Sequence, residues 1–401
     1  MVNAFQPQSG VAERCRAKSL RTQLKRRTIP DPGFRQFVLS PHRAAHPCSQ
    51  APVSRITRWL CPMAFLFLQL ILPPSARSQA NQSLAAVIRE AQTALDAGDL
   101  SRAIAEFENA QQLSPKNVDV NRGLVLSYFQ AGRLGDAQRV AEFAVGQWPR
   151  DAQLQHWLGL VYFKQGRGQD ALRALERSES LNPNGSDIHF DMALVLLSEE
   201  QYPSAADELE KAIKLDPKVA LPHLLLGRAY QNTNRTVKAI EEFHTALRLD
   251  PDIPLGHYHL GFAYASLGRN QDAIVEYEKE ALRRPANVSV LYQLGHCLLQ
   301  AGDWKSAVAH LRNAAELDPK NSEVSYDLGK ALLQQGDVKA AVLALRNAAE
   351  LNPGSPNPHY QLARALEKAG EKEQAQQEFQ TFAALKKAQP VSGGMAAGPA
   401  Q

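Results

Sequence analysis

The sequence predicts an all-α solenoid of about nine helix-turn-helix repeats, each 34 residues long. Two observations carry this prediction. Proline recurs every 34 residues, and a fixed period of this size is typical of stacked repeats. Alanine, small residues and large apolar residues recur in the same register. The prolines are Pro115, Pro149, Pro183, Pro217, Pro251, Pro285, Pro319 and Pro353.

Each unit is numbered so that its proline is position 32, which gives units from 84–117 to 356–389. Position 20 is alanine in all nine units, and position 8 is glycine or alanine in all except one, which has Val125. Positions 11 and 24 are mostly tyrosine, phenylalanine or leucine. Small residues at 8 and 20 let two helices approach closely, and the large residues fill the flanks.

The elements of one unit follow from its pattern. In 254–287, apolar residues recur at spacings of three and four in two stretches of about 13 residues, which predicts two amphipathic helices. Gly268 lies between them and can adopt the left-handed conformation that ends a helix. The proline is predicted to start the next helix, where its missing N–H costs little. One helical hairpin cannot bury both of its faces, so neighbouring units must stack.

The leader, residues 1–80, differs from the rest of the chain in composition. It contains 12 Lys/Arg and two acids, a net charge of +10. In 55–80, two arginines precede the apolar run 59–72, and small residues end at Ala80. This order is typical of a secretory signal peptide. We therefore predict cleavage near Ala80 and export of the mature protein to the periplasm or the extracellular space.

Two alternatives remain open for the leader. The apolar run could be retained as a short anchor, although as a helix it would cover only about 21 Å of a hydrocarbon core roughly 30 Å thick. No stable transmembrane anchor is therefore expected. Residues 1–54 are Arg-rich and show no helical or strand period. They are predicted to be a disordered basic extension, or to precede the true start of translation.

The charge and cysteine content of the body exclude some classes of function. Removing the leader from 45 basic and 41 acidic residues leaves 33 and 39, so residues 81–401 carry a net charge of −6. Nucleic-acid binding needs clustered Lys/Arg, and we expect none. The body has one cysteine, Cys297, which excludes an internal disulfide.

The repeat resembles the tetratricopeptide repeat. Its pattern of Leu-Gly-x-x-Tyr, Ala, Phe, Ala and Pro is clearest from Leu226 to Pro251, and the resemblance covers about residues 81–389. Glu280 and Phe382 depart from it where a small residue is usual, and Lys387 replaces the last proline. The resemblance implies a right-handed superhelical solenoid that binds a protein or peptide partner. Because no residue group has catalytic spacing, we expect neither a cofactor nor enzyme activity.

The resemblance also implies a binding surface. In this family the first helix of each unit lines a concave groove, into which positions 2, 5, 9, 12 and 13 project. Tyrosines at position 5, with polar and basic residues at 9 and 13, would suit an extended peptide, although position 5 tyrosines are common in the family and could serve packing alone. The predicted groove residues are Tyr258, Phe262, Tyr292, His296, Gln300, Tyr326, Lys330, Gln334, Tyr360, Arg364 and Lys368.

No residue group predicts catalysis or metal binding. Four histidines share position 4, but equivalent residues on stacked helices lie roughly 10 Å apart, too far to share one ion. We expect these histidines to replace a packing aromatic. Cys297 has no base in register and is predicted to be a buried, inert thiol. The position 4 histidines are His189, His223, His257 and His359.

The ends of the array also fit a solenoid. Ser83 is predicted to cap the first helix after the cleavage site. The last helix, 371–387, has a polar outer side, as a terminal repeat requires. Residues 390–401 are rich in Gly, Ala and Pro and are predicted to be a disordered tail.

The sequence thus predicts an exported interaction scaffold that binds a peptide or protein partner of unknown identity in its groove. The alternative is a structural subunit or assembly factor of a cell-envelope secretion or polymer-export machine. Such a subunit would use its convex face or the end of its array.

Overall fold

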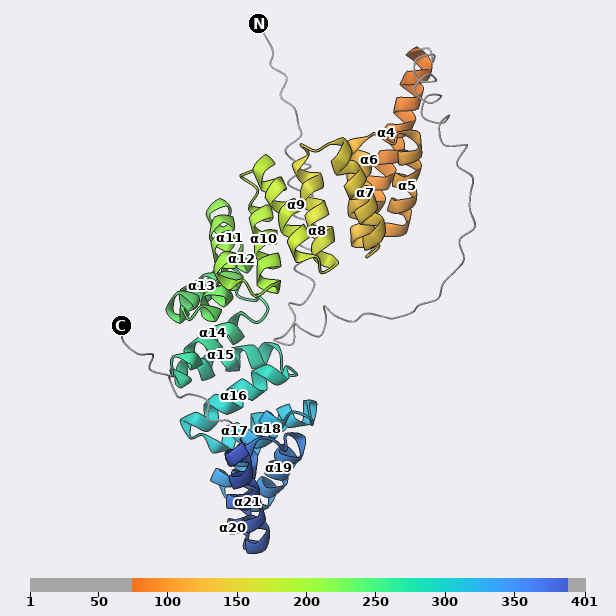
Figure 1. The fold of residues 1–401 in the computed structure, drawn as a ribbon. Coiled ribbons are helices and arrows are strands. Elements are labelled where there is room, and N and C mark those ends of the chain that lie inside the picture. Colours follow the sequence, from red (N-terminus) through yellow and green to blue (C-terminus); the bar gives the residue numbers. More distant parts are fainter. Residues whose placement is uncertain (1–73, 389–401) are drawn as a thin grey trace, which may run out of the picture. The chain divides into compact units, whose positions relative to one another are not determined.

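The computed structural model of the protein describes residues 74–388, with side chains from Ser83 onward. These residues form eighteen helices and no strand, which confirms the predicted helical-repeat fold (Figure 1). None of the helices in this range is both long and apolar enough to cross a membrane. Of the predicted segments, the basic extension, the apolar run and the C-terminal tail lie outside the described residues.

The helices fall into two compact units, 74–217 with α4–α11 and 218–388 with α12–α21. The helices of the first unit are α4 (Pro74–Asp96), α5 (Leu100–Leu113), α6 (Val118–Gln130), α7 (Leu134–Gln147), α8 (Ala152–Lys164), α9 (Gly168–Leu181), α10 (Ser186–Ser198) and α11 (Tyr202–Leu215). Those of the second are α12 (Ala220–Asn232), α13 (Thr236–Leu249), α14 (Gly256–Ser266), α15 (Asn270–Arg283), α16 (Val288–Ala301), α17 (Trp304–Leu317), α18 (Ser322–Gln335), α19 (Val338–Leu351), α20 (Pro356–Ala369) and α21 (Lys372–Ala388).

Each repeat is a pair of helices in close contact. The reason for glycine at position 8 is visible at Gly227, where a β-carbon would lie 2.5 Å from Cε1 of Phe243 on the second helix. Gly159 meets Leu175 in the same way. Real β-carbons do not approach other atoms so closely, so a side chain at Gly227 or Gly159 would force Phe243 or Leu175 to shift.

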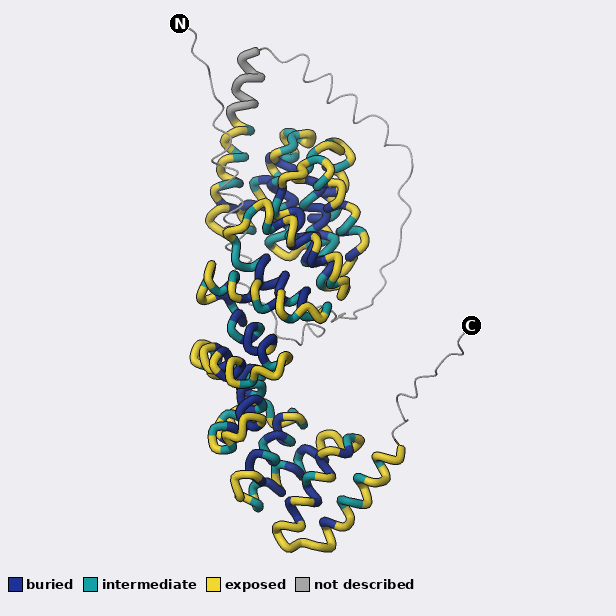
Figure 2. Tube along the Cα trace, turned by 90° about the vertical axis from the view of Figure 1, so that its left-hand side faces the viewer, coloured by how far each residue is buried: buried dark blue, intermediate teal, exposed yellow. Residues whose placement is uncertain are grey.

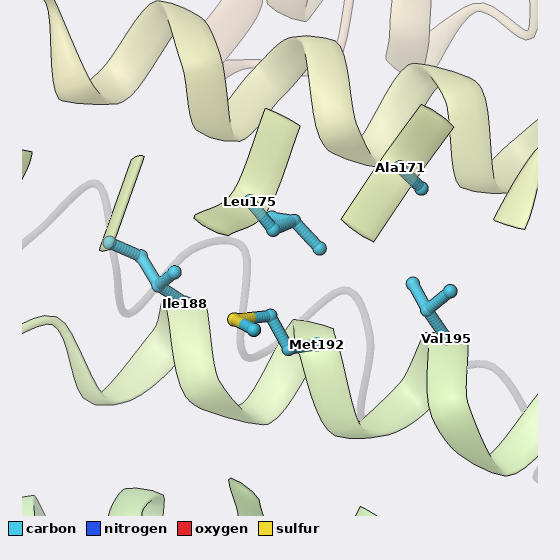
Figure 3. Close-up of a cluster of buried hydrophobic side chains, with 5 residues drawn as sticks. All are labelled: Ala171, Leu175, Ile188, Met192 and Val195. Atoms are coloured by element: carbon cyan, nitrogen blue, oxygen red, sulfur yellow. The ribbon is translucent and has the colours of Figure 1, made fainter. Parts of the chain in front are cut away.

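The core continues from one repeat to the next. In the first unit, Ala171 and Leu175 of α9 pack against Ile188, Met192 and Val195 of α10, which belongs to the following repeat (Figure 3). All five side chains are buried. Within each unit, burial follows the facing sides of the helices (Figure 2). The repeats therefore share their core, as the stacking argument predicted.

The turn between the helices of a repeat is set at positions 15 and 16. Gly268 has φ +71°, which confirms the predicted left-handed conformation. The next residue differs between repeats. At position 16, Arg269 stacks on Tyr264 of its own repeat, with its guanidinium carbon 4.4 Å from the ring centroid. In contrast, Asp303 accepts a hydrogen bond from the backbone N–H of Ser306 and caps α17.

The two ends of the array differ from each other. Helix α4 begins at Pro74, because proline fits the first turn of a helix without loss of a hydrogen bond. Ser83 therefore lies inside α4, and its prediction as an N-cap is wrong. At the other end, α21 buries only Ala375 and is otherwise largely exposed (Figure 2). This pattern confirms the predicted polar terminal helix.

Candidate binding groove

The first helices of the repeats in the second unit form a continuous row. Each of α12, α14, α16, α18 and α20 contacts the next one in this order. Side chains join neighbouring members of the row: His296 contacts Asp327, and Tyr326 is hydrogen-bonded to Gln361. Residues at positions 5 and 9 therefore lie along the row. We call the eleven predicted groove residues, from Tyr258 to Lys368, the candidate face.

The structure exposes some residues of the candidate face and covers others. Tyr258 is only 6% exposed, and its ring packs against those of Tyr277 and His259 at centroid distances of 5.8 and 5.4 Å. It therefore offers little surface to a partner. The partly buried residues are Tyr292, His296, Tyr326 and Lys330. The exposed residues are Phe262, Gln300, Gln334, Tyr360, Arg364 and Lys368.

A buried carboxylate organises the middle of the candidate face. Asp327 on α18 is 3% exposed, and its Oδ2 lies 2.7 Å from Nδ1 of His296 on α16. Its Oδ1 lies 3.5 Å from Nζ of Lys330. The Lys330 ammonium also sits 5.2 Å from the centroid of the Tyr326 ring. Asp327 therefore fixes the His296 imidazole and balances the charge of Lys330.

The two tyrosines of this cluster are held in the neutral form. Burial, followed by the charges of Asp327 and Glu323, raises the pKa of Tyr292. Burial and Asp327 also raise the pKa of Tyr326. Both phenols can therefore donate a hydrogen bond across the physiological pH range.

The end of the candidate face is built differently. The Tyr360 ring lies 5.1 Å from that of Phe382 and 6.0 Å from that of Phe379, both on α21. Phe382 is one of the two departures from the small-residue pattern, and here it supports an aromatic that is 38% exposed. The guanidinium carbon of Arg364 lies 5.9 Å from the centroid of the Tyr360 ring. Arg364 and Lys368 form no ion pair with any residue between Ser83 and Ala388.

The position 4 histidines are more than packing residues. In each case Nδ1 contacts a glutamate at position 23 of the same repeat, at 2.5 to 2.7 Å. The prediction from sequence missed these carboxylates, although every repeat with His at position 4 has Glu at position 23. The glutamates are Glu208, Glu242, Glu276 and Glu378.

A second buried acid was also missed. Asp191 of α10 lies 2.6 Å from Nε2 of His156 on α8, so the first unit repeats the contact between position 6 and the preceding first helix. Burial lowers the pKa of His156, but the hydrogen bond and charge of Asp191 raise it overall. The available signal for both Asp191 and Asp327 was an acid at the same position 6 of their repeats.

The remaining candidates for chemistry lack a site. Cys297 is buried, and burial raises its pKa to about 11, so the thiol is protonated near neutral pH. Burial lowers the pKa of His259 to about 3, and Arg228 contributes to this shift. In the part of the chain with described side chains, no group of three metal-binding residues comes together.

Comparison with known proteins agrees with the fold. One family model, described as tetratricopeptide repeat, matches residues 122–186, 158–220 and 292–356. A second with the same description matches 94–142, 196–259 and 332–390. No curated protein matches the sequence significantly.

Several solved structures are similar to this chain. YrrB, described as a TPR protein with an unusual peptide-binding site, is 20% identical over 47% of this chain and 96% of its own, with a TM-score of 0.43. The Cut9–Hcn1 hetero-tetramer is 19% identical over 67% of this chain and 52% of that chain, with a TM-score of 0.47. MamA from Desulfovibrio magneticus RS-1 is 22% identical over 42% and 96%, with a TM-score of 0.41.

Proposed function

Because the chain belongs to the tetratricopeptide-repeat family and is therefore a protein–protein interaction scaffold, we propose that it is exported and binds an extended peptide of a partner protein on the candidate face. Tetratricopeptide scaffolds are generally not enzymes, and we propose no reaction.

The observation that carries the proposal is the pattern of exposure along the row of first helices. Phe262 and Tyr360 are 39% and 38% exposed although both are aromatic. Arg364 and Lys368 share α20 with Tyr360, and Gln300 and Gln334 are exposed on α16 and α18. The row therefore offers both apolar area and hydrogen-bond donors. Aromatic and arginine side chains dominate the energy of many interfaces.

The backing of the face also supports the proposal. Phe379 and Phe382 hold the Tyr360 ring, and Asp327 holds His296. Side chains fixed before binding lose less conformational entropy when a partner arrives. An extended peptide must itself become ordered, so we expect a dissociation constant on the order of micromolar.

Loss of partner capture in substituted variants tests the site. The full chain, with Phe262, Gln334 and Tyr360 replaced by alanine, should capture at most about a tenth of the partner that the unsubstituted chain captures from the exported fraction. The circular dichroism spectrum should stay helical, and the melting temperature should fall only slightly, because Tyr360 loses its contacts with Phe379 and Phe382 at the end of the array. Unaltered capture by this folded variant would refute binding on the candidate face.

Export has a separate test, which is sequencing of the N-terminus of the protein purified from its source. The expected mature chain begins at Asn81. In the described chain Ala80 lies within α4, so cleavage would shorten this helix by its first seven residues, 74–80. A purified chain that begins at Met1 would contradict export through a cleaved signal peptide.

The alternative function, as a subunit or assembly factor of an envelope machine, is favoured by apolar residues exposed on second helices. Leu282 on α15 is 85% exposed, Leu343 on α19 is 66% exposed, and Val275 is exposed as well. Serine at these three positions should leave capture unchanged if the candidate face binds the partner. Loss of capture in this variant alone would favour the alternative.

A further inference from the structure

Cations and acids are unevenly distributed over the first helices of the second unit. In the second unit, residues 218–388 contain 20 Lys/Arg and 19 Asp/Glu. Positions 5, 9 and 13 of its five first helices hold four of these cations and none of the acids. The acids nearest to them along the row are Glu323 at position 2, Asp327 at position 6 and Glu367 at position 12. The four cations are Arg228, Lys330, Arg364 and Lys368.

The three cations that belong to the candidate face fall into two kinds. Lys330 lies 3.5 Å from buried Asp327, so its charge is already balanced within the protein. Arg364 and Lys368 lie four residues apart on α20, and side chains at this spacing are neighbours on a helix surface. Both are exposed, and within 83–388 neither has a carboxylate in ion-pair distance.

The neighbours of Arg364 define the rest of the site. The exposed ring of Tyr360 lies beside the guanidinium, and α21 fixes this ring through Phe379 and Phe382. An arginine that is fixed in this way can bind a carboxylate through two parallel N–H donors. A nearby lysine adds a second charge, and an aromatic ring adds apolar contact area.

We propose that this end of the candidate face selects peptides that carry acidic side chains, with a carboxylate bound between Arg364 and Lys368 beside Tyr360. The inference rests on the proposed function, because it names the partner class for the same face. Asp327 limits the selection to this end of the face, because it withholds the charge of Lys330.

Fluorescence anisotropy with the full chain and two labelled peptides tests the inference. In one peptide tyrosine alternates with glutamate, and in the other glutamine replaces each glutamate. We expect the acidic peptide to bind about fivefold or more tightly in about 0.05 M salt, and the preference to fall below about twofold in about 0.5 M salt. The double variant Arg364→Gln, Lys368→Gln should lose the preference but keep its affinity for the glutamine peptide.

Two further variants make the test specific. Lys305→Gln with Lys339→Gln removes the same charge from exposed positions of the second helices α17 and α19, and should keep the preference. Lys330→Gln should also keep it, because Asp327 already balances Lys330. Equal binding of both peptides by the unsubstituted chain, or a preference that survives the double variant, would overturn the inference and leave the proposed function standing. If neither peptide binds, both fail.

Discussion

At the scale of single residues, position 24 of one repeat contains a buried hydroxyl group that lacks a hydrogen-bond partner among the described residues. Tyr277 occupies this position and is fully buried, and no residue within 83–388 binds its hydroxyl. Burial raises the pKa of this phenol, so it remains neutral. The equivalent positions in two other repeats hold Phe107 and Phe243, which fill the same space without a polar atom.

Replacement of Tyr277 by phenylalanine should therefore stabilise the protein. An unsatisfied buried hydroxyl costs about 1–3 kcal/mol, so Tyr277→Phe should raise the free energy of unfolding, measured by urea denaturation, by about 1 kcal/mol. Tyr264 is the matched control, because its hydroxyl lies 2.9 Å from Nε2 of His244 and Tyr264→Phe should destabilise. A loss of stability in Tyr277→Phe would show that a buried partner, such as a water molecule, binds the hydroxyl.

Single residues also mark the limit of prediction from sequence. The eleven residues of the candidate face could be named from their positions in the repeat, but their exposure could not. Tyr258 and Tyr360 share position 5, yet one is covered by Tyr277 and His259 and the other rests on α21 with its outer side exposed. The neighbouring side chains determine the exposure of each tyrosine, and several of these neighbours come from other helices.

At the scale of elements, the helices could be predicted because their apolar period is strong, but the polar contacts between them could not. The bond from His257 to Glu276 joins α14 to α15 across 19 residues, and a helical period says nothing about such a pair. Local chemistry also shifts the helix ends. Helix α14 begins only at Gly256, after Leu255 in a left-handed conformation with φ +62°. The other first helices from α6 onward begin at position 1, so the prolines at position 32 precede these helices and do not start them as predicted.

The pairs between positions 4 and 23 should stabilise each repeat. Burial alone would raise the pKa of Glu276, but hydrogen bonds from His257 and Lys279 lower it overall. A carboxylate with a lowered pKa contributes stability above its ordinary pKa of 4.5, and this contribution is lost as the pH falls through the lowered value. Glu276→Gln should therefore reduce the free energy of unfolding at pH 7 by about 1–2 kcal/mol.

The pH dependence distinguishes this ionic contribution from simple packing. Urea denaturation of the unsubstituted protein and of Glu276→Gln at pH 7 and near pH 3 should show a difference that shrinks at the lower pH, because a carboxylate with a lowered pKa contributes its full stability only above its ordinary pKa of 4.5. Glu278→Gln, at an exposed position on the same helix, is the control and should have little effect at either pH. An unchanged difference between the two pH values would contradict the ionic role of Glu276.

At the scale of the whole molecule, the number of repeats could be read from the prolines, because one period dictates one hairpin. The division into units of 74–217 and 218–388 could not. Pro217 occupies the same position 32 as the other prolines, and nothing in its repeat marks a boundary. The candidate face, including Arg364 and Lys368, lies within the second unit, so the proposed binding involves that unit alone.

The most direct test of the account is site-specific photo-cross-linking to the captured partner. A photoreactive residue is placed at Gln334 on the candidate face, or at Leu343 on the second helix of the same repeat, and both positions are exposed. We predict that the partner cross-links from position 334 and not from position 343. Cross-links from position 343, with none from position 334, would contradict binding along the row of first helices.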